Sequence, residues 1–121
     1  MAKHLETGKK GEDLATKLLK EKGYAILETN WRFRRAEVDI IAKDGKILVF
    51  VEVKTRSYDY FGKPASFVSA RKKVLLQDAA TAYMRKINHT WEIRFDIIGI
   101  LLPKNKKMEF NHFEDAFFPG L

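Results

Sequence analysis

Residues 38–54 read VDIIAKDGKILVFVEVK and decide the fold. Two apolar runs, residues 38–42 and 47–54, flank a polar tetrapeptide with Asp-Gly at its centre. Asp-Gly between apolar runs predicts a β-hairpin, because glycine tolerates the positive φ that a tight turn requires. Both runs are rich in valine, isoleucine, leucine and phenylalanine. This composition is typical of strands that lie inside a sheet and are covered on both faces.

Acidic side chains occupy this hairpin at positions where charge is costly. We expect residues 44–45 to form its two-residue loop, which places Asp39 opposite Phe50. The same pairing places Glu37 opposite Glu52. Asp39 and Glu52 then become diagonal neighbours, with Cα atoms about 7–8 Å apart. Because side chains alternate between the two faces of a strand, one face then carries four charged groups: Glu37, Asp39, Glu52 and Lys54.

A group of three carboxylates on a covered sheet predicts a bound cation. The carboxylates repel one another and resist desolvation. A divalent cation offsets both costs, and carboxylate oxygens suit Mg²⁺, so we expect Mg²⁺ or Mn²⁺ as cofactor. Two acids can hold such a metal on a phosphodiester, where the metal lowers the pKa of a bound water and offsets charge at the phosphorus. Lys54 can orient this water or stabilise the pentavalent phosphorane. The alternative is a solvated patch at the end of the sheet, with Lys54 in a salt bridge.

The rest of the chain predicts an α/β fold with a mixed central sheet flanked by helices. Helical periodicity, strand-like runs and turn residues give the order αβββαββ. The expected helices cover residues 7–22 and 69–87, and the further strands cover residues 24–30, 92–102 and 108–113. We expect residues 1–121 to form one domain. Arg94 and Asp96 should pair with each other or cap the sheet edge, a structural role, and we assign no role to His4, His89 or His112.

The charge balance favours a polyanionic partner. Lysine and arginine number 23 against 16 aspartates and glutamates, a net charge of +7. Nucleic acid is the commonest partner of such a surface, although a merely solvated lysine-rich surface is an equal alternative. The absence of cysteine excludes disulfides and cysteine-based zinc sites. Because no apolar segment has the length of a signal or a membrane span, we expect a cytoplasmic protein with no membrane partner.

Four motifs in order carry a resemblance to a known family. They are GKKGEDLA at 8–15, NWRFRRAEVDIIA at 30–42, LVFVEVKTR at 48–56 and RFDIIGI at 94–100. With these motifs, nearly the whole chain resembles the YraN-like family of uncharacterised bacterial proteins. The Asp39, Glu52 and Lys54 arrangement also resembles the PD-(D/E)xK nuclease superfamily, which includes restriction endonucleases and Holliday-junction resolvases.

This resemblance implies a restriction-endonuclease-like fold and action on DNA or RNA. Asp39, Glu52 and the Val53 carbonyl would bind the metal, and Lys54 would assist the nucleophile. The superfamily often adds an acidic residue from its first helix, a place that Glu12 matches. An equal alternative for Glu12 is compensation of the helix dipole.

Basic and aromatic residues around the acids suggest how nucleic acid would bind. The candidate phosphate-binding side chains are Arg32, Arg34, Arg35, Arg56, Lys63 and Lys72. For Lys72, on the inner stripe of its helix, we favour snorkelling to water over contact with the acids or a phosphate. Tyr58, Tyr60 and Phe61 would stack on unpaired bases or pack locally.

Three functions are compatible with these features. The first is a metal-dependent nuclease with structure-selective or non-specific action, because a chain of 121 residues offers little surface for reading a sequence. The second is a non-catalytic nucleic-acid-binding module that retains the nuclease fold. The third is an interaction protein, and a homodimer is possible in any of them.

Overall fold

The computed structural model describes residues 2–56, 68–102 and 107–117. The elements follow the predicted order αβββαββ, and α1 begins before the predicted residue 7. They are α1 (Ala2–Glu21), β1 (Ala25–Phe33), β2 (Ala36–Asp44), β3 (Ile47–Arg56), α2 (Ala70–Ile87), β4 (Ile93–Leu101) and β5 (Glu109–Phe113). No helix in these ranges is long and apolar enough to cross a membrane.

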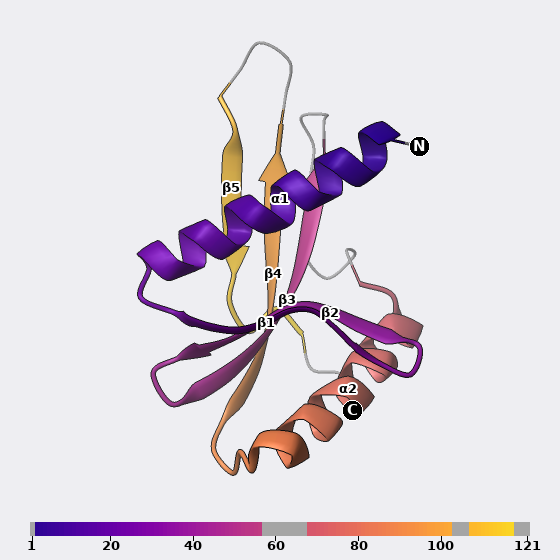
Figure 1. Ribbon diagram of the computed structural model, residues 1–121, viewed down its shortest axis with the longest axis vertical. Helices are drawn as coiled ribbons and strands as arrows, with labels where there is room; N and C mark the ends of the chain where they lie inside the picture. Colours follow the sequence, from indigo (N-terminus) through magenta and orange to yellow (C-terminus); the bar gives the residue numbers. More distant parts are fainter. Residues whose placement is uncertain (1, 57–67, 103–106, 118–121) are drawn as a thin grey trace.

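The five strands form one mixed sheet in the order β1-β2-β3-β4-β5 (Figure 1). Strands β3 and β4 are parallel, and α2 provides the crossover connection that a parallel pair requires. The other three pairs of neighbouring strands are antiparallel. This confirms the predicted α/β fold with a mixed central sheet, as in a restriction-endonuclease-like core.

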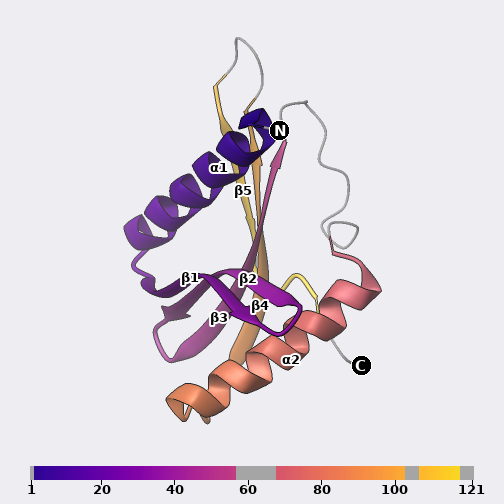
Figure 2. The same cartoon turned by 45° about the vertical axis from the view of Figure 1, so that its right-hand side comes forward.

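The two helices cover opposite faces of the sheet (Figure 2). On the α1 face, Leu19 packs with Val49 and Ile98 in one buried cluster. On the α2 face, Phe50 and Tyr83 belong to a second buried cluster, and their rings meet edge to face with centroids 6.3 Å apart. Because consecutive residues of β3 are buried on opposite faces, the prediction of strands covered on both sides is confirmed.

The register of the β2–β3 hairpin differs from the predicted one by two residues. Asp44 pairs with Ile47, so the loop consists of Gly45 and Lys46 instead of Asp44 and Gly45. Gly45 has φ +62°, which suits the first central position of a hairpin turn, where glycine is favoured. A shift of two residues preserves the alternation of faces, so it changes cross-strand partners without turning any side chain to the other face.

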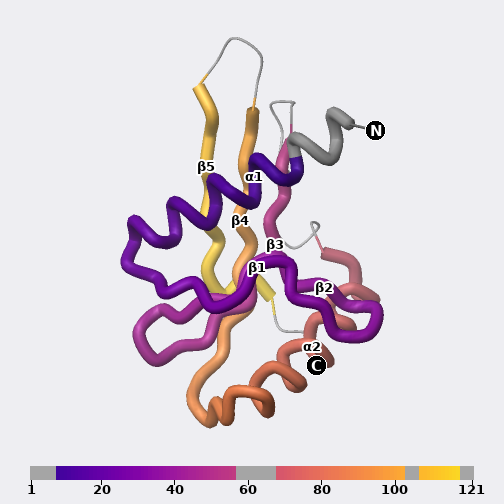
Figure 3. Tube along the Cα trace, viewed as in Figure 1, coloured from indigo at the N-terminus to yellow at the C-terminus, as the bar shows by residue number. Residues whose placement is uncertain are grey.

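Strands β2 and β3 diverge beyond this ladder, and the divergence creates the candidate site. Their pairing extends only to Ile40 and Val51. On the N-terminal side of Ile40, residues 36–39 of β2 lie along β1 only. On the C-terminal side of Val51, residues 52–56 of β3 lie along β4 only. The trace in Figure 3 shows β1 and β2 running across the direction of β4 and β5. We call the region between residues 36–39 of β2 and residues 52–56 of β3, where the two strands diverge, the fork.

Candidate metal centre

Asp39 is the first residue of β2 beyond its ladder with β3, and its carboxylate faces the fork. The backbone N–H of Val53 donates to Asp39 Oδ2 over 2.7 Å. The side chain thus satisfies a backbone donor that the diverging strand leaves without a ladder partner. This bond fixes the carboxylate between the two strands, so Val53 contacts the predicted metal ligand through its N–H.

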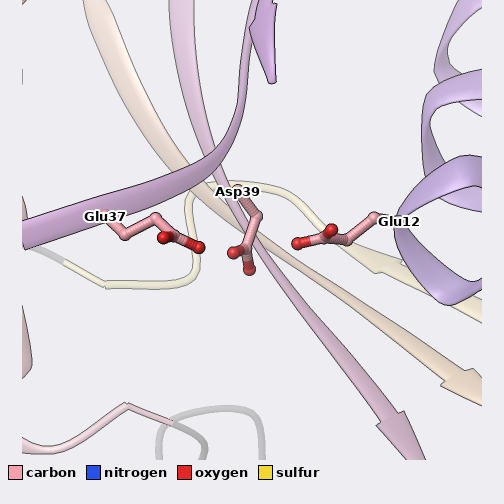
Figure 4. A group of neighbouring side chains, drawn as sticks. All are labelled: Glu12, Glu37 and Asp39. Atoms are coloured by element: carbon pink, nitrogen blue, oxygen red, sulfur yellow. The ribbon is translucent and has the colours of Figure 1, made fainter. Parts of the chain in front are cut away.

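Three carboxylates converge at this point, from two elements. Glu37 and Asp39 come from β2 and Glu12 comes from α1 (Figure 4). One oxygen of each lies within 4.8 Å of the other two. The structure therefore brings Glu12 to Asp39, as the resemblance implied. It also adds Glu37, which the hairpin pattern placed in the carboxylate group expected to attract a cation but which we had not named as a metal ligand. We call Glu12, Glu37 and Asp39 the acidic triad.

Gly11 allows α1 to come close enough for Glu12 to reach Asp39. A Cβ at Gly11 would collide with Thr55 Oγ1 and lie 3.1 Å from Thr55 Cβ. The glycine therefore serves close helix–strand packing. The Asn30 amide, oriented with its nitrogen toward Glu12, donates to both carboxylate oxygens over 3.0 and 3.2 Å. No role was predicted for Asn30, although it begins one of the motifs that carry the resemblance.

The electrostatics of the triad show an excess of negative charge. Burial, followed by the negative charge of Glu52, raises the pKa of Asp39 to about 8. The bond from Val53 opposes this rise and is outweighed. Burial, followed by the charge of Glu37, also raises the pKa of Glu12. Asp39 and Glu12 therefore hold their protons more tightly than in water, as expected where buried carboxylates meet without a cation.

Glu52 is neutralised by Lys72, a contact that the sequence analysis did not favour. Glu52 is only 3% exposed on β3, and the Lys72 ammonium from α2 forms a salt bridge with its Oε2. The Lys72 side chain is 39% exposed, so it bends inward to the acid instead of snorkelling fully into water. Among the described residues, Oε2 has no partner with hydrogen-bond geometry. This carboxylate is therefore buried with one charge partner and unused acceptor capacity.

The triad fits a hard divalent cation. Mg²⁺ binds oxygens at about 2.1 Å, so octahedral ligands lie roughly 3.0–4.2 Å apart. Triad oxygens within 4.8 Å of one another need only small side-chain movements to reach this spacing. The donor set consists of carboxylate oxygens alone, which suits Mg²⁺ or Mn²⁺ and not a soft metal. Glu12, Glu37 and Asp39 would therefore hold the ion, with Glu52 beside Asp39.

Two pockets adjoin the triad. One of about 340 Å³ is lined by Glu37 and Asp39 together with Arg35, Arg71 and Lys72. The other, of about 630 Å³, is lined by Glu12 and Glu37 and extends along α1 past Lys9. The acids are therefore accessible from both sides, with cations on the rim, which suits a polyanionic chain passing over them. Arg71 is a rim residue that the sequence analysis did not single out.

The remaining predicted residues are placed as follows. Lys54 lies two positions beyond Glu52, on the same face of β3, and forms no salt bridge with a described carboxylate.

The arginines predicted to bind phosphate make local contacts. Arg32 forms a salt bridge with Glu37 over 2.7 Å. Arg34 lies over the Phe33 ring. The Arg56 carbonyl accepts from Leu102 N over 2.8 Å at the end of β3. Outside the described residues lie Lys63, Tyr58, Tyr60 and Phe61.

A separate polar network holds β4, β5 and the end of α1 together. Arg94 pairs with Asp96 over 2.9 Å, which confirms the predicted pairing, and also contacts Asp44 over 3.1 Å. The pair does not cap the sheet edge, because β4 lies between β3 and β5. His112 lies 2.7 Å from the other Asp96 oxygen, and Lys22 contacts the second nitrogen of the same ring. His112, to which we had assigned no role, therefore belongs to the scaffold.

The sequence matches one family over most of its length. The model of the uncharacterised protein family UPF0102 matches residues 11–100, an interval that contains all the acids of the site and Lys72. A UPF0102 protein of Flavobacterium psychrophilum is 51% identical over 118 residues and 98% of each chain. One from Bacteroides thetaiotaomicron is 41% identical over 121 residues, covering 100% of this chain and 99% of the relative. The chain therefore belongs to the uncharacterised protein family UPF0102, the YraN family that its four motifs predict.

Proposed function

We propose that this protein is a nuclease that uses Mg²⁺ or Mn²⁺ to hydrolyse phosphodiester bonds of DNA or RNA. One observation carries the proposal: the acidic triad converges within 4.8 Å in a fork whose adjoining pocket is lined by Arg35, Arg71 and Lys72. Carboxylates that bind a cation and basic groups that bind phosphate are the two components such a reaction requires. The resemblance to the PD-(D/E)xK superfamily supports the same reaction.

The geometry of the site suggests how several of its residues would act in this reaction. The bound metal would supply a water of lowered pKa and offset charge on the phosphate. The Val53 N–H holds Asp39 in place, and Gly11 lets α1 bring Glu12 beside it. Lys54 forms no salt bridge with a described carboxylate, so its ammonium is available to stabilise negative charge that develops at the phosphorus. The basic rim residues would bind neighbouring phosphates and position the scissile bond.

The proposal is tested by cleavage assays on single-stranded, duplex and branched DNA and RNA with Mg²⁺ or Mn²⁺. We expect Lys54→Met to slow cleavage about 10²–10³-fold, a typical cost of losing one transition-state contact. Asp39→Asn should abolish cleavage, whereas Lys17→Met, at an exposed position of α1, should leave it unchanged. Cleavage by Asp39→Asn at the wild-type rate would rule out the assigned site.

The Lys72–Glu52 salt bridge favours a second candidate, a module that binds nucleic acid without cleaving it. Lys72 neutralises an acid that the superfamily uses for metal, which leaves fewer free ligands at the fork. This candidate predicts salt-sensitive binding, with a Kd that rises steeply with ionic strength, and no cleavage with any divalent metal. Metal-dependent cleavage that disappears in Asp39→Asn would exclude it.

A further inference from the structure

Trp91 is a large aromatic side chain that is 62% exposed. It lies in the loop between α2 and β4, away from the acidic triad. The other tryptophan, Trp31, is partly buried against the core and stacks on Phe33 with ring centroids 6.2 Å apart. An exposed tryptophan forgoes a large gain from burial, so its ring is available to a ligand.

The loop that presents Trp91 is held by several backbone bonds. Asn88 ends α2 in the left-handed region with φ 56°, and His89 N donates to Met84 O over 2.9 Å. At the other end of the loop, Leu48 N donates to Glu92 O over 3.0 Å, and the His89 ring contacts the same carbonyl. These bonds fix the backbone on both sides of Trp91, so little conformational entropy would be lost when a ligand binds its ring.

One lysine lies over this ring, and a second lines the pocket beside it. The Lys46 ammonium lies 5.8 Å from the centroid of the Trp91 ring. Lys43 and Lys46 both line a pocket of about 310 Å³ next to Trp91, which also includes the C-terminal end of α2 at Ile87. Of the nearby acids, Asp44 is already paired with Arg94 over 3.1 Å. Glu92, next to Trp91 in the chain, is exposed and does not line this pocket.

We propose that Trp91 is a stacking platform for an unpaired base of single-stranded nucleic acid, with Lys43 and Lys46 on the flanking phosphates. Base–aromatic stacking combined with backbone cations is the usual way to bind single strands without reading their sequence. Charge complementarity decides between possible occupants. A second copy of this chain would bring a net charge of +7 toward these lysines, whereas a nucleic acid strand brings phosphates.

The platform extends the proposed function and rests on it for its role. Helix α2 runs from Lys72 at the fork to Asn88 beside the platform, a rise of about 24 Å at ~1.5 Å per residue. A strand bound at both ends of α2 would have one stretch at the acids and an unpaired stretch on Trp91. The substrate class is then a nucleic acid with a single-stranded segment next to the scissile bond.

Binding is measured in EDTA, so that cleavage plays no part. Fluorescence anisotropy compares a labelled oligothymidylate with an abasic strand of the same length, which keeps the phosphates and lacks the bases. We expect Trp91→Ala to raise the Kd for oligothymidylate about tenfold, the cost of losing one stacked base. Trp91→Phe should retain most of the affinity, and Val74→Ala, at a 51% exposed apolar residue of α2, should retain all of it.

The abasic strand separates stacking from charge. It should bind wild type about tenfold more weakly than oligothymidylate and should not distinguish Trp91→Ala from wild type. Lys46→Gln should weaken both strands and reduce the salt slope by about 0.7. Equal binding of the two strands by wild type would overturn the platform, as would a wild-type dimer in sedimentation that Trp91→Ala makes monomeric. If Trp91→Ala and the abasic strand give the expected losses of affinity but no strand is cleaved when metal is added, only the nuclease proposal is wrong.

Discussion

At the residue scale, two charged side chains satisfy groups that the diverging strands leave without partners at the fork: Asp39 serves a backbone N–H, and Lys72 serves a buried carboxylate. Asp39 accepts the Val53 N–H over 2.7 Å where the β2–β3 ladder has ended. Lys72 provides the positive charge that the buried Glu52 carboxylate requires. Removing either partner would leave a buried polar group unpaired, which costs more than the interaction itself contributes. These contacts therefore hold the site in place before any ligand arrives.

The first prediction concerns the charge that Lys72 supplies. Lys72→Met leaves Glu52 buried without a cation, so we expect the metal-free protein to be destabilised by about 3 kcal/mol. Mn²⁺ should then raise the melting temperature of the variant more than that of wild type, because Glu52 becomes available as a ligand. Differential scanning calorimetry with and without Mn²⁺ measures both effects. Equal stabilisation of the two proteins by Mn²⁺ would show that Lys72 does not compete with metal.

The second prediction concerns pH and the scaffold network around Asp96. Burial alone would raise the pKa of Asp96, but hydrogen bonds from His112, Arg94 and the Asp115 N–H outweigh it and hold the pKa below 3.8. A lowered pKa adds stability that is fully present above the unfolded value and is lost as pH falls through the folded value. The stability advantage of wild type over Asp96→Asn should therefore be largest near neutral pH.

Urea unfolding of both proteins from pH 7 to pH 2 tests this direction. At neutral pH we expect Asp96→Asn to cost about 3 kcal/mol, because Arg94 loses its fully buried partner. The difference should narrow as pH falls below the usual Asp value of 3.8. A difference that stays constant over this range would mean that the network does not depend on the charge of Asp96.

At the scale of elements, the site depends on how closely α1 approaches β3. Gly11→Ala would force α1 away from Thr55 and move Glu12 from Asp39. We expect Mn²⁺ affinity to fall about tenfold, the least that displaced ligand geometry usually costs. Gly8→Ala is the matched control, because a Cβ there meets nothing within 4 Å. It should leave metal affinity unchanged and stabilise the helix by about 0.5–1 kcal/mol.

Isothermal titration calorimetry compares these two variants with wild type. Thr55→Ala in the Gly11→Ala background should recover part of the affinity, because it removes the hydroxyl that the new methyl group meets. If Gly11→Ala binds Mn²⁺ as tightly as wild type, the close approach of α1 does not position Glu12.

Element order and residue faces were predictable from local rules, whereas cross-strand partners were not. Alternation kept Glu52 and Lys54 on one face of β3 even though the hairpin loop lies at residues 45–46 and not 44–45. The turn could not be fixed from Asp-Gly alone, because glycine suits more than one position in a tight turn. Likewise, the place where β2 leaves β3 depends on the twist of the whole sheet, which a local pattern does not encode.

At the scale of the whole molecule, the site needs both faces of the sheet. Glu12 comes from α1 on one face, and Lys72 comes from α2 on the other. Nothing in the sequence spacing of Lys72 and Glu52 places them together, since their contact forms only when α2 docks. The 3.6-residue period put Lys72 on the inner stripe of its helix but could not tell an inward contact from snorkelling. The docking of α2 on the sheet favours the inward contact, because it brings the Lys72 ammonium to Glu52.

A calorimetric titration of Mn²⁺ into wild type, Asp39→Asn and Glu21→Gln decides whether the fork is a metal centre. We expect wild type to bind the metal and Asp39→Asn to lose at least about tenfold in affinity. Glu21→Gln, an exposed acid at the end of α1, should bind like wild type. Failure of wild type to bind Mn²⁺, or equal binding by Asp39→Asn, would contradict the claim that the fork is a metal centre.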